Sequence, residues 1–568
     1  MARARRVISP SVAHAVGLLA VYVVVIVWRT WPLAAHVATH VPDAQFDALY
    51  PLWALAYETH ALSTAPLRFA DANIYHPATG TLFYGPIVMG VLPLFAPTFL
   101  ATGNPFLALN LSFMGCVALT ALGLHLVVRR WTGSAAGGFL AAWTVLTNAW
   151  LFAWVPRVPQ YVSLFYLPWI ALLASGTALG MRRAAIMVPL VVLQCLAEPI
   201  YIAPAILGPL GVLALGRLAR RSSRGAGVRL LGVLALSGLL LLPIYAGYVT
   251  VRAENPALQE QSLWGGGELP PVLWLGWAGL SCSTFLPKEC PANASVVTLG
   301  IILMGLGALA LDRVRHRPAV SGWAPGALWT IVGLSLSAVR FRFFGRMPIA
   351  FPHMEAVVRY MPRFYPDRLG VAALMGFAML TGVAIAQCAQ RGRPGVRRPL
   401  AGALALLCAS ALYVERRSHL PSPFPIAPTQ NLRPALLDAL ARTEGPLLEL
   451  PVGGMPTSDL LEDRFQSALA NARAMCRSMF HWRPLLNGYS SYWPRGFPER
   501  MALARRLPDA EALAALRRVS GLRVVLVRIR ELQPSDRSAW LQLAANGGRT
   551  DLRLLAHGED ELLFDLPP

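Results

Sequence analysis

Two carboxylates lie close together in the stretch VPDAQFDALYPLW, residues 41–53, just after a long apolar segment. Asp43 and Asp47 are four residues apart, so a helix would place both on one face. Pro51 leaves the Asp47 carbonyl without its helical donor, which predicts either a kink at Asp47 or a helix that begins near Pro51. In both cases Asp47 lies near a helix start, where the helix dipole stabilises a carboxylate.

Two interpretations of Asp47 follow from its position. It is either a capping residue on a helix at the membrane surface or a group that takes part in chemistry there. In the first case the neighbouring aromatic side chains form an interfacial belt, which composition alone favours; they are Phe46, Tyr50, Trp53 and Tyr57. The stretch DANIYHPATGTL, residues 71–82, poses the same choice, because Asp71 and His76 either cap turns or face the same cavity as Asp47.

The composition predicts a polytopic α-helical membrane protein. The chain has 568 residues, of which 55% are hydrophobic and 14% are charged, and soluble domains rarely carry so little charge. Several apolar runs reach the roughly 17–25 residues that span a bilayer. The net charge of +21 does not indicate nucleic acid, because the arginines cluster between apolar segments. Arginine in place of lysine, with Lys288 as the single lysine, is typical of GC-rich bacterial coding.

The basic connectors set the predicted topology. If all of them are cytoplasmic, as the positive-inside rule predicts, the run 185–216 crosses twice and turns near 197–201, beside Glu198. The run 80–101, with its three prolines, is then re-entrant or juxtamembrane. The count becomes about 11 crossings, with a retained first helix, the N-terminus inside and the C-terminus outside. The apolar segments are 11–30, 80–101, 105–128, 134–154, 160–178, 185–216, 229–248, 296–312, 322–338, 369–388 and 399–415.

Three loops and the tail then face the outside of a bacterial cytoplasmic membrane. They are 31–79, 249–295, 339–368 and the region from 416. The loop 339–368 breaks the positive-inside rule, so its arginines need another explanation; they are Arg340, Arg342, Arg346, Arg359, Arg363 and Arg368. In the loop 249–295, Cys282 and Cys290 form either a disulfide, as an oxidising compartment allows, or two unpaired thiols.

The chain divides into a membrane domain, 1–415, and a soluble extracytoplasmic domain, 416–568, of α/β or α+β class. In the second domain the residue pattern predicts strands at 445–452 and 522–529 and a hairpin within 552–566 that turns at HGED. A helix is predicted at 508–521, opened by Pro508 and Asp509 and followed by Gly521.

The first external loop resembles that of bacterial membrane proteins with a GT-C glycosyltransferase fold. In those proteins a D…W…W..HAL stretch precedes an N-I-F-Y-P segment and a short re-entrant helix. Here Asp47, Trp53, Tyr57 and HAL at 60–62 precede DANIYHP. VRRWTGS at 128–134 resembles the family's ARRLTG junction. The later stretches MPRFYPDRLGVAALMGFAMLTGVA, GPLLELPVGG and MFHWRPLLNGYSSYWP are also similar, so that the resemblance spans nearly the whole chain.

The resemblance implies transfer of a sugar from a polyprenyl-phosphate-linked donor to an envelope glycan, lipid or protein, with inversion. It implies Asp47 as the general base, with Asp43 as the alternate. Arginine pairs two phosphate oxygens with its planar fork, so Arg363, Arg368 and Arg359 are predicted to bind the donor phosphate. The residues expected to bind substrate are Asp71, His76, His60, Glu198, His481, Arg483 and Tyr489.

Three questions stay open at this point. The stretch FYGPIVMG, where the family often carries a further Glu or His, has no ionisable group. The chain is therefore either an enzyme with one working carboxylate or a catalytically silent relative that acts in envelope assembly. A lipid or polysaccharide transporter is the third hypothesis, disfavoured because the polar groups cluster outside the spans. No cysteine or histidine spacing predicts a metal site, although two carboxylates could still bind Mg²⁺ or Mn²⁺.

Overall fold

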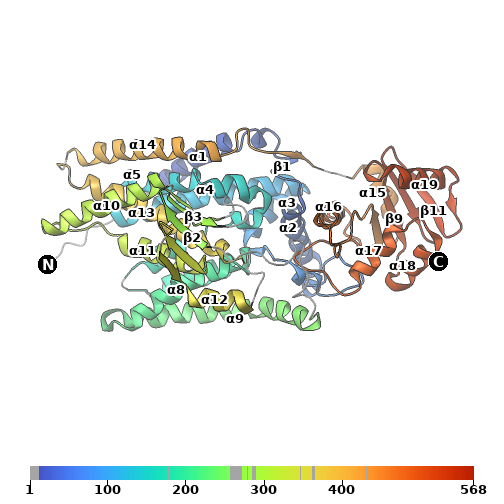
Figure 1. The fold of residues 1–568 in the computed structure, drawn as a ribbon, viewed down its shortest axis with the longest axis horizontal. Coiled ribbons are helices and arrows are strands. Elements are labelled where there is room, and N and C mark those ends of the chain that lie inside the picture. Colours follow the sequence, from blue (N-terminus) through green and yellow to red (C-terminus); the bar gives the residue numbers. More distant parts are fainter. Residues whose placement is uncertain are drawn as a thin grey trace.

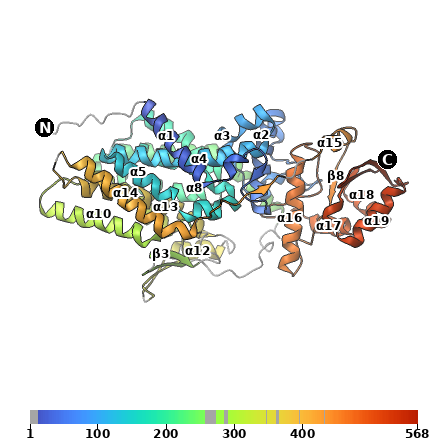
Figure 2. The ribbon, with the colours of Figure 1, turned by 90° about the horizontal axis from the view of Figure 1, so that it is seen from above.

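The computed structural model describes residues 12–176, 178–255, 272–277, 279–283, 290–345, 347–360, 365–393, 395–429 and 432–567. The molecule is elongated (Figure 1). Long helices run along its length at one end, and a smaller region of helices and strands forms the other end, where the chain finishes. The view from above shows the same division (Figure 2).

Among the described residues, six helical segments are long and apolar enough to cross a membrane. Ala135–Leu146 and Trp150–Arg157 form a further pair bent by 40°, which makes up to seven in that part of the chain. The chain is therefore a multi-pass membrane protein, and the count of 11 crossings stays a prediction. The six segments are Val12–Arg29, Pro105–Thr132, Arg221–Glu254, Val296–Val314, Pro366–Ala389 and Arg397–His419.

The helices of the bundle follow the predicted apolar segments. The predicted turn within 185–216 is confirmed, because α7 ends at Ala197 and α8 begins at Ile202. The helices are α1 (Val12–Arg29), α4 (Pro105–Thr132), α5 (Ala135–Leu146), α6 (Leu167–Ala174), α7 (Met181–Ala197), α8 (Ile202–Leu218), α9 (Arg224–Glu254), α10 (Val296–Val314), α11 (Trp323–Leu336), α13 (Val371–Ala389) and α14 (Arg397–Arg416).

Helix α13 forms the centre of the bundle and packs against α5, α10 and α11. Small residues allow this, because a Cβ added at Gly382 would lie 2.3 Å from the carbonyl oxygen of Gly137 on α5. Close backbone approach of this kind is typical of helix packing in membranes.

Between α1 and α4, no helix among the described residues is both long and apolar enough to cross a membrane. Helix α2 (Phe46–Thr64) is followed by 3₁₀ turns and by α3 (Leu92–Thr102). At about 1.5 Å per residue, the 11 residues of α3 are too short to cross a bilayer. Helix α4, with 28 residues, has the length to do so.

The C-terminal region contains a five-stranded sheet with the order β10-β11-β12-β9-β8, in which β8 and β9 are parallel. The predicted strands, hairpin and helix are confirmed, and Asp509 caps α18 as expected. The elements are α15 (Pro434–Ala441), β8 (Leu447–Leu450), α16 (Leu461–Ser478), α17 (Phe497–Arg505), α18 (Ala510–Ser520), β9 (Val524–Arg528), α19 (Pro534–Ala545), β10 (Gly548–Arg549), β11 (Leu552–His557) and β12 (Glu561–Asp565).

This region packs directly on the first external loop. Helix α16 contacts α2, and β1 (His40–Val41) pairs with β7 (Ala427–Pro428). The backbone of 73–76 also pairs with 485–487, since Tyr75 N donates to Asn487 O at 3.0 Å and Leu485 N donates to Asn73 O at 2.8 Å.

A second five-stranded sheet, not expected from the sequence, combines two predicted loops. Its order is β4-β3-β2-β5-β6. Cys290, in the first of these loops, is disulfide-bonded, whereas the side chain of Cys282 lies outside the described residues. The elements are β2 (Val272–Gly276), β3 (Gly279–Ser283), β4 (Ala294–Ser295), β5 (Arg340–Phe343), β6 (Met347–Ala350) and the helix α12 (Pro352–Tyr360) that follows.

Candidate active site

Asp47 lies in the first turn of α2. The helix begins at Phe46 after the N-cap Gln45 and continues through Pro51, so the prediction of a helix start near Pro51 is wrong. Pro51 lies inside this helix, where it removes one backbone hydrogen bond, to the Asp47 carbonyl, without ending the helix. Asp43 precedes α2, where its Oδ1 accepts the Gln45 N–H at 2.7 Å. The two carboxylates therefore do not share a helix face.

The Asp47 carboxylate is bound by a residue from the C-terminal region. The hydroxyl of Tyr489 donates to Asp47 Oδ1 at 2.6 Å. Burial raises the pKa of Asp47, and the Tyr489 hydrogen bond and the charge of Arg368 oppose that rise. A carboxylate with a raised pKa is a stronger base once it is ionised.

Arg368 lies in the 3₁₀ turn Pro366–Gly370 that leads into α13. Its Nη1 donates to the Tyr161 hydroxyl at 3.1 Å. Four aromatic rings surround the guanidinium at 4.6 to 5.5 Å from its central carbon. Cation–π contacts of this kind hold an arginine in one orientation. The rings are those of Trp154, Tyr161, Tyr201 and Tyr365.

Glu198 lies at the turn between α7 and α8. It is buried, and it accepts the N–H groups of Tyr201 and Ile202 at the start of α8. Although Glu198 lies at a turn between two helices, its side chain is therefore not at the surface. Burial raises its pKa to about 6, against the backbone hydrogen bonds and the charge of Arg368. Arg368 thus acts electrostatically on both Asp47 and Glu198.

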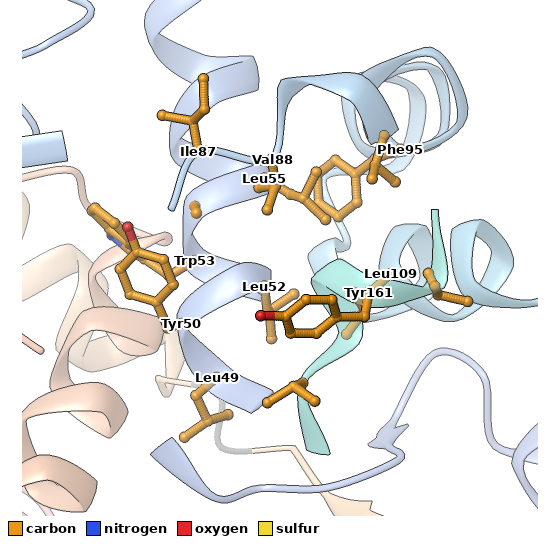
Figure 3. Close-up of a cluster of buried hydrophobic side chains, with 14 of the residues drawn as sticks. Leu49, Tyr50, Leu52, Trp53, Leu55, Ile87, Val88, Phe95, Leu109 and Tyr161 are labelled. Carbon is orange, nitrogen blue, oxygen red and sulfur yellow. The ribbon is translucent and has the colours of Figure 1, made fainter. Parts of the chain in front are cut away.

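A small apolar pocket adjoins this site. Pro51 and Leu55 line it and follow Asp47 at four-residue spacing, so the pocket lies along the Asp47 face of α2. Gln160 and Val162, on either side of Tyr161, line it as well. Figure 3 shows Leu52 and Leu55 pointing toward Tyr161, Leu109 and Phe95, while Tyr50 and Trp53 point away from them.

Comparison with known proteins identifies the fold of the chain. No family model and no curated protein matches the sequence. Among solved structures, arabinofuranosyltransferase AftD from Mycobacteria superposes with a TM-score of 0.56 at 14% identity, over 99% of this chain. The chain has the GT-C glycosyltransferase fold. The resemblance expected from the sequence is therefore confirmed at the level of the fold.

The chain spans 40% of the length of AftD. Two further structures with the GT-C fold were found. ArnT from Cupriavidus metallidurans, bound to undecaprenyl phosphate, is 13% identical over 98% of both chains, with a TM-score of 0.46. The oligosaccharyltransferase AglB from Archaeoglobus fulgidus, in complex with an inhibitory peptide and a dolichol-phosphate, is 10% identical. That match covers 91% of this chain and 69% of AglB, with a TM-score of 0.44.

Within the GT-C fold of this chain, the other predicted residues have different neighbours. Asp43 contacts Arg157, with 3.8 Å between Oδ2 and Nε. Arg359 is exposed in the last turn of α12. Arg363 lies outside the described residues. Of the two predicted phosphate-binding arginines that the structure describes, Arg368 is the one whose charge acts on Asp47, where it opposes the rise in pKa caused by burial.

Most of the predicted substrate-binding residues make structural contacts. The Asp71 carboxylate accepts the Gly80 N–H at 2.8 Å, as a turn cap does. Arg483 donates to the carbonyl oxygens of Gly445 and Leu440. Burial lowers the pKa of His481 to about 3 and also lowers the pKa of His76.

His60 and Tyr489 are placed differently from these residues. The ring of His60 stacks on that of Trp482, with centroids 4.3 Å apart. Tyr489, predicted to bind acceptor sugar, instead contacts the candidate base. Its role at Asp47 could not be read from the sequence, because 442 residues separate the two.

Two features of the site were missed. The stretch WLFAWVPRVPQY, residues 150–161, supplies Trp154 and Tyr161, and its prolines and aromatic residues in a broken helix were a signal that could have been used. Glu58 on α2 was also missed. Its Oε1 accepts the N–H of Val88, at 2.8 Å, so it brings a carboxylate to the stretch FYGPIVMG that has none of its own. Burial raises the pKa of Glu58 to about 8.

The described residues contain no group of three His, Cys, Asp or Glu side chains that could hold a metal ion. Near Asp47 the closest carboxylate in sequence, Asp43, is turned toward the Gln45 N–H and Arg157. Binding of Mg²⁺ or Mn²⁺ by the two carboxylates therefore stays a prediction, which a measurement of metal dependence tests.

Proposed function

We propose that this chain is a membrane glycosyltransferase that moves a sugar from a polyprenyl-phosphate-linked donor to a hydroxyl of an envelope glycan, lipid or protein. The single observation that carries the proposal is a buried carboxylate, Asp47, whose pKa is raised by burial while the positive charge of the ring-enclosed Arg368 opposes that rise. One group accepts a proton and the other holds an anion, which are the two parts that this transfer needs.

The proposed step balances as follows. The Asp47 carboxylate takes the proton of the acceptor hydroxyl, and the acceptor oxygen forms a bond to the anomeric carbon of the sugar. The bond between that carbon and the phosphate oxygen breaks, and the electron pair leaves with the polyprenyl phosphate. Attack from the face opposite the phosphate inverts the configuration at the anomeric carbon.

Arg368 is suited to the leaving phosphate. Its planar fork can pair two phosphate oxygens, and the rings of Tyr201 and Tyr365 keep the guanidinium from turning away. Fixed cations stabilise developing charge at little reorganisation cost. The apolar pocket next to Tyr161 gives the isoprenyl chain that follows the phosphate an apolar surface.

The proposal also places the site outside the cytoplasmic membrane of a bacterium, with the N-terminus inside. Residues 1–415 then form the membrane domain, and residues 416–568 form an extracytoplasmic domain that covers Asp47. The contact of Tyr489 with Asp47 supports a C-terminal domain that completes the site.

The test compares a deletion strain complemented with wild type, Asp47→Asn or Asp536→Asn. Asp536 is an exposed carboxylate on α19 and serves as the matched control. We expect Asp47→Asn to reproduce the glycan and glycolipid profile of the deletion strain, while membrane abundance of the protein is unchanged. If Asp47→Asn restores the wild-type profile, Asp47 is not the base.

A further inference from the structure

The second sheet presents an exposed face with aromatic and basic side chains. In the parallel pair β2–β5, Trp274 lies opposite Arg342, and Leu273 lies opposite Phe341. Leu273 is buried against the helical bundle, whereas Trp274 is 50% exposed and Arg342 is exposed. One face of the sheet therefore packs on the bundle, and the other face combines an indole with a guanidinium.

The tips of the two hairpins lie together and are apolar. Phe344 follows β5, and its N–H donates to Leu275 O on β2 at 2.8 Å. The ring of Phe344 contacts those of Trp277 and Phe343, with 4.8 Å between centroids in each case. Trp277 is 89% exposed. Large aromatic side chains this exposed are unusual on a surface that faces only water.

The position of the sheet decides which partner fits. Strand β4 leads directly into α10, a helix of span length whose exposed side chains include Leu303 and Leu306. Figure 2 shows the hairpin around β3 projecting sideways from the bundle beside the end of α10. The exposed aromatic tips thus continue the apolar surface that α10 presents to lipid.

We propose that the two hairpins, β2–β3 and β5–β6, form a wedge that lies in the headgroup layer of the leaflet on the side of the C-terminal region. Trp277, Phe343 and Phe344 contact the acyl boundary, where aromatic rings are favoured. Arg342 on the outward face binds anionic phosphate headgroups. This occupant also explains why the loop carries arginines against the positive-inside rule.

The charges agree with an anionic partner. Glu355 on α12 lies 3.6 Å from Arg340, with both side chains partly exposed, so one of the arginines has a carboxylate neighbour. Arg342 and Arg359 add exposed positive charge in the same segment. Strands β4 and β6 are the two edges of the sheet. Unpaired backbone groups at a strand edge are costly in hydrocarbon, so the sheet fits the headgroup layer and not the hydrocarbon core.

The first test places a photo-cross-linking amino acid, benzoylphenylalanine, at Trp277 in the full chain in nanodiscs of phosphatidylcholine and phosphatidylglycerol. We expect lipid adducts by mass spectrometry. The same group at Leu460, which is 71% exposed on the C-terminal region, is the matched control and should give no adduct. Equal yields at the two positions would overturn the wedge. In native membranes, glycan adducts at 277 without lipid adducts would overturn it in favour of a glycan-binding surface.

The second test addresses the headgroup. With the cross-linker at 277, we expect phosphatidylglycerol to be enriched in the adducts over its share of the nanodisc lipids, and Arg342→Gln to remove that enrichment. Arg505→Gln, an exposed arginine on α17, is the control and should leave it unchanged. If the share of phosphatidylglycerol in the wild-type adducts equals its share in the nanodisc lipids, Arg342 does not bind anionic headgroups. Neither result depends on sugar transfer, so the wedge and the proposed function fail separately.

Discussion

The hydroxyl of Tyr489 donates a 2.6 Å hydrogen bond to Oδ1 of Asp47, across 442 residues of sequence. The phenol comes from the C-terminal region and the carboxylate from the first turn of α2. The ring of Tyr489 also packs edge-on against that of Phe46, with centroids 5.2 Å apart. The ionisation of the candidate base therefore depends on how the C-terminal region sits on α2.

Removing that hydrogen bond should move the pH dependence of transfer. The Tyr489 hydroxyl stabilises the Asp47 carboxylate, so Tyr489→Phe raises a pKa that burial already raises. Since the carboxylate is the active form, the acid limb of the rate profile moves to higher pH, by about one unit for a typical hydrogen bond. Initial rates between pH 4 and 9 measure it, with Tyr492→Phe as the control. An unmoved limb would contradict the proposed base.

Asp43 should matter far less than Asp47. Its contact with Arg157 is 3.8 Å long, and the Arg157 side chain is 61% exposed, so the pair is worth about 0–1 kcal/mol. We expect Asp43→Asn to lower transfer by no more than about fivefold, whereas loss of a general base typically costs about 10²–10⁴-fold. Rates of both variants with one donor decide this. A larger loss for Asp43→Asn would exchange the two roles.

Replacement of Arg368 should weaken donor use. Lysine keeps the charge but lacks the planar fork and the stacking on Tyr365 and Tyr201. We expect Arg368→Lys to lower kcat/KM for the donor by about 10–100-fold, or about 1.4–2.8 kcal/mol. The acceptor KM should change little, and Arg505→Gln is the control. An acceptor-specific defect would mean that Arg368 does not bind the phosphate.

Glu58 should make stability fall as pH rises. Its folded pKa, raised by burial to about 8, exceeds the ordinary value of 4.5. A raised folded pKa means that its stabilising contribution is fully present below about pH 4.5 and is lost as pH approaches 8. Glu58→Gln stays neutral and keeps an acceptor for Val88, so we expect a thermal midpoint above wild type at pH 8 and a smaller difference at pH 5. Glu462→Gln, exposed on α16, should show no such trend.

The C-terminal region depends on a buried ion pair. Arg477 and Glu449 are 2% and 1% exposed, and Arg477 also contacts Glu531. Glu449→Ala leaves a buried charge with less compensation, which costs about 3–5 kcal/mol. Hydrogen exchange at the amides of β8 and β9 should report it. Glu449→Leu combined with Arg477→Met should recover much of that loss, since no buried charge remains. Equal losses for the single and double variants would point to packing instead.

The sequence predicted helices and strands correctly where the pattern involved only neighbouring residues. The strand and helix signals between 445 and 566 produced β8, β9, α18 and the β11–β12 hairpin. The break beside Glu198 followed from length and basic ends alone. The strands in loops 249–295 and 339–368 could not be predicted in this way. They pair with each other although the helices α10 and α11 separate the two loops in the sequence.

By itself the sequence determined that this chain is a membrane protein, where its apolar helices lie and that Asp47 lies near the start of a helix. The periodicity and the length of an apolar segment depend only on residues that are neighbours in the sequence, so both can be recognised without a three-dimensional structure. Only the tertiary structure decided that Tyr489 binds Asp47, that four rings enclose Arg368, and that Glu58 reaches Val88. These contacts join segments far apart in sequence, and burial sets the pKa values only after those segments have packed together.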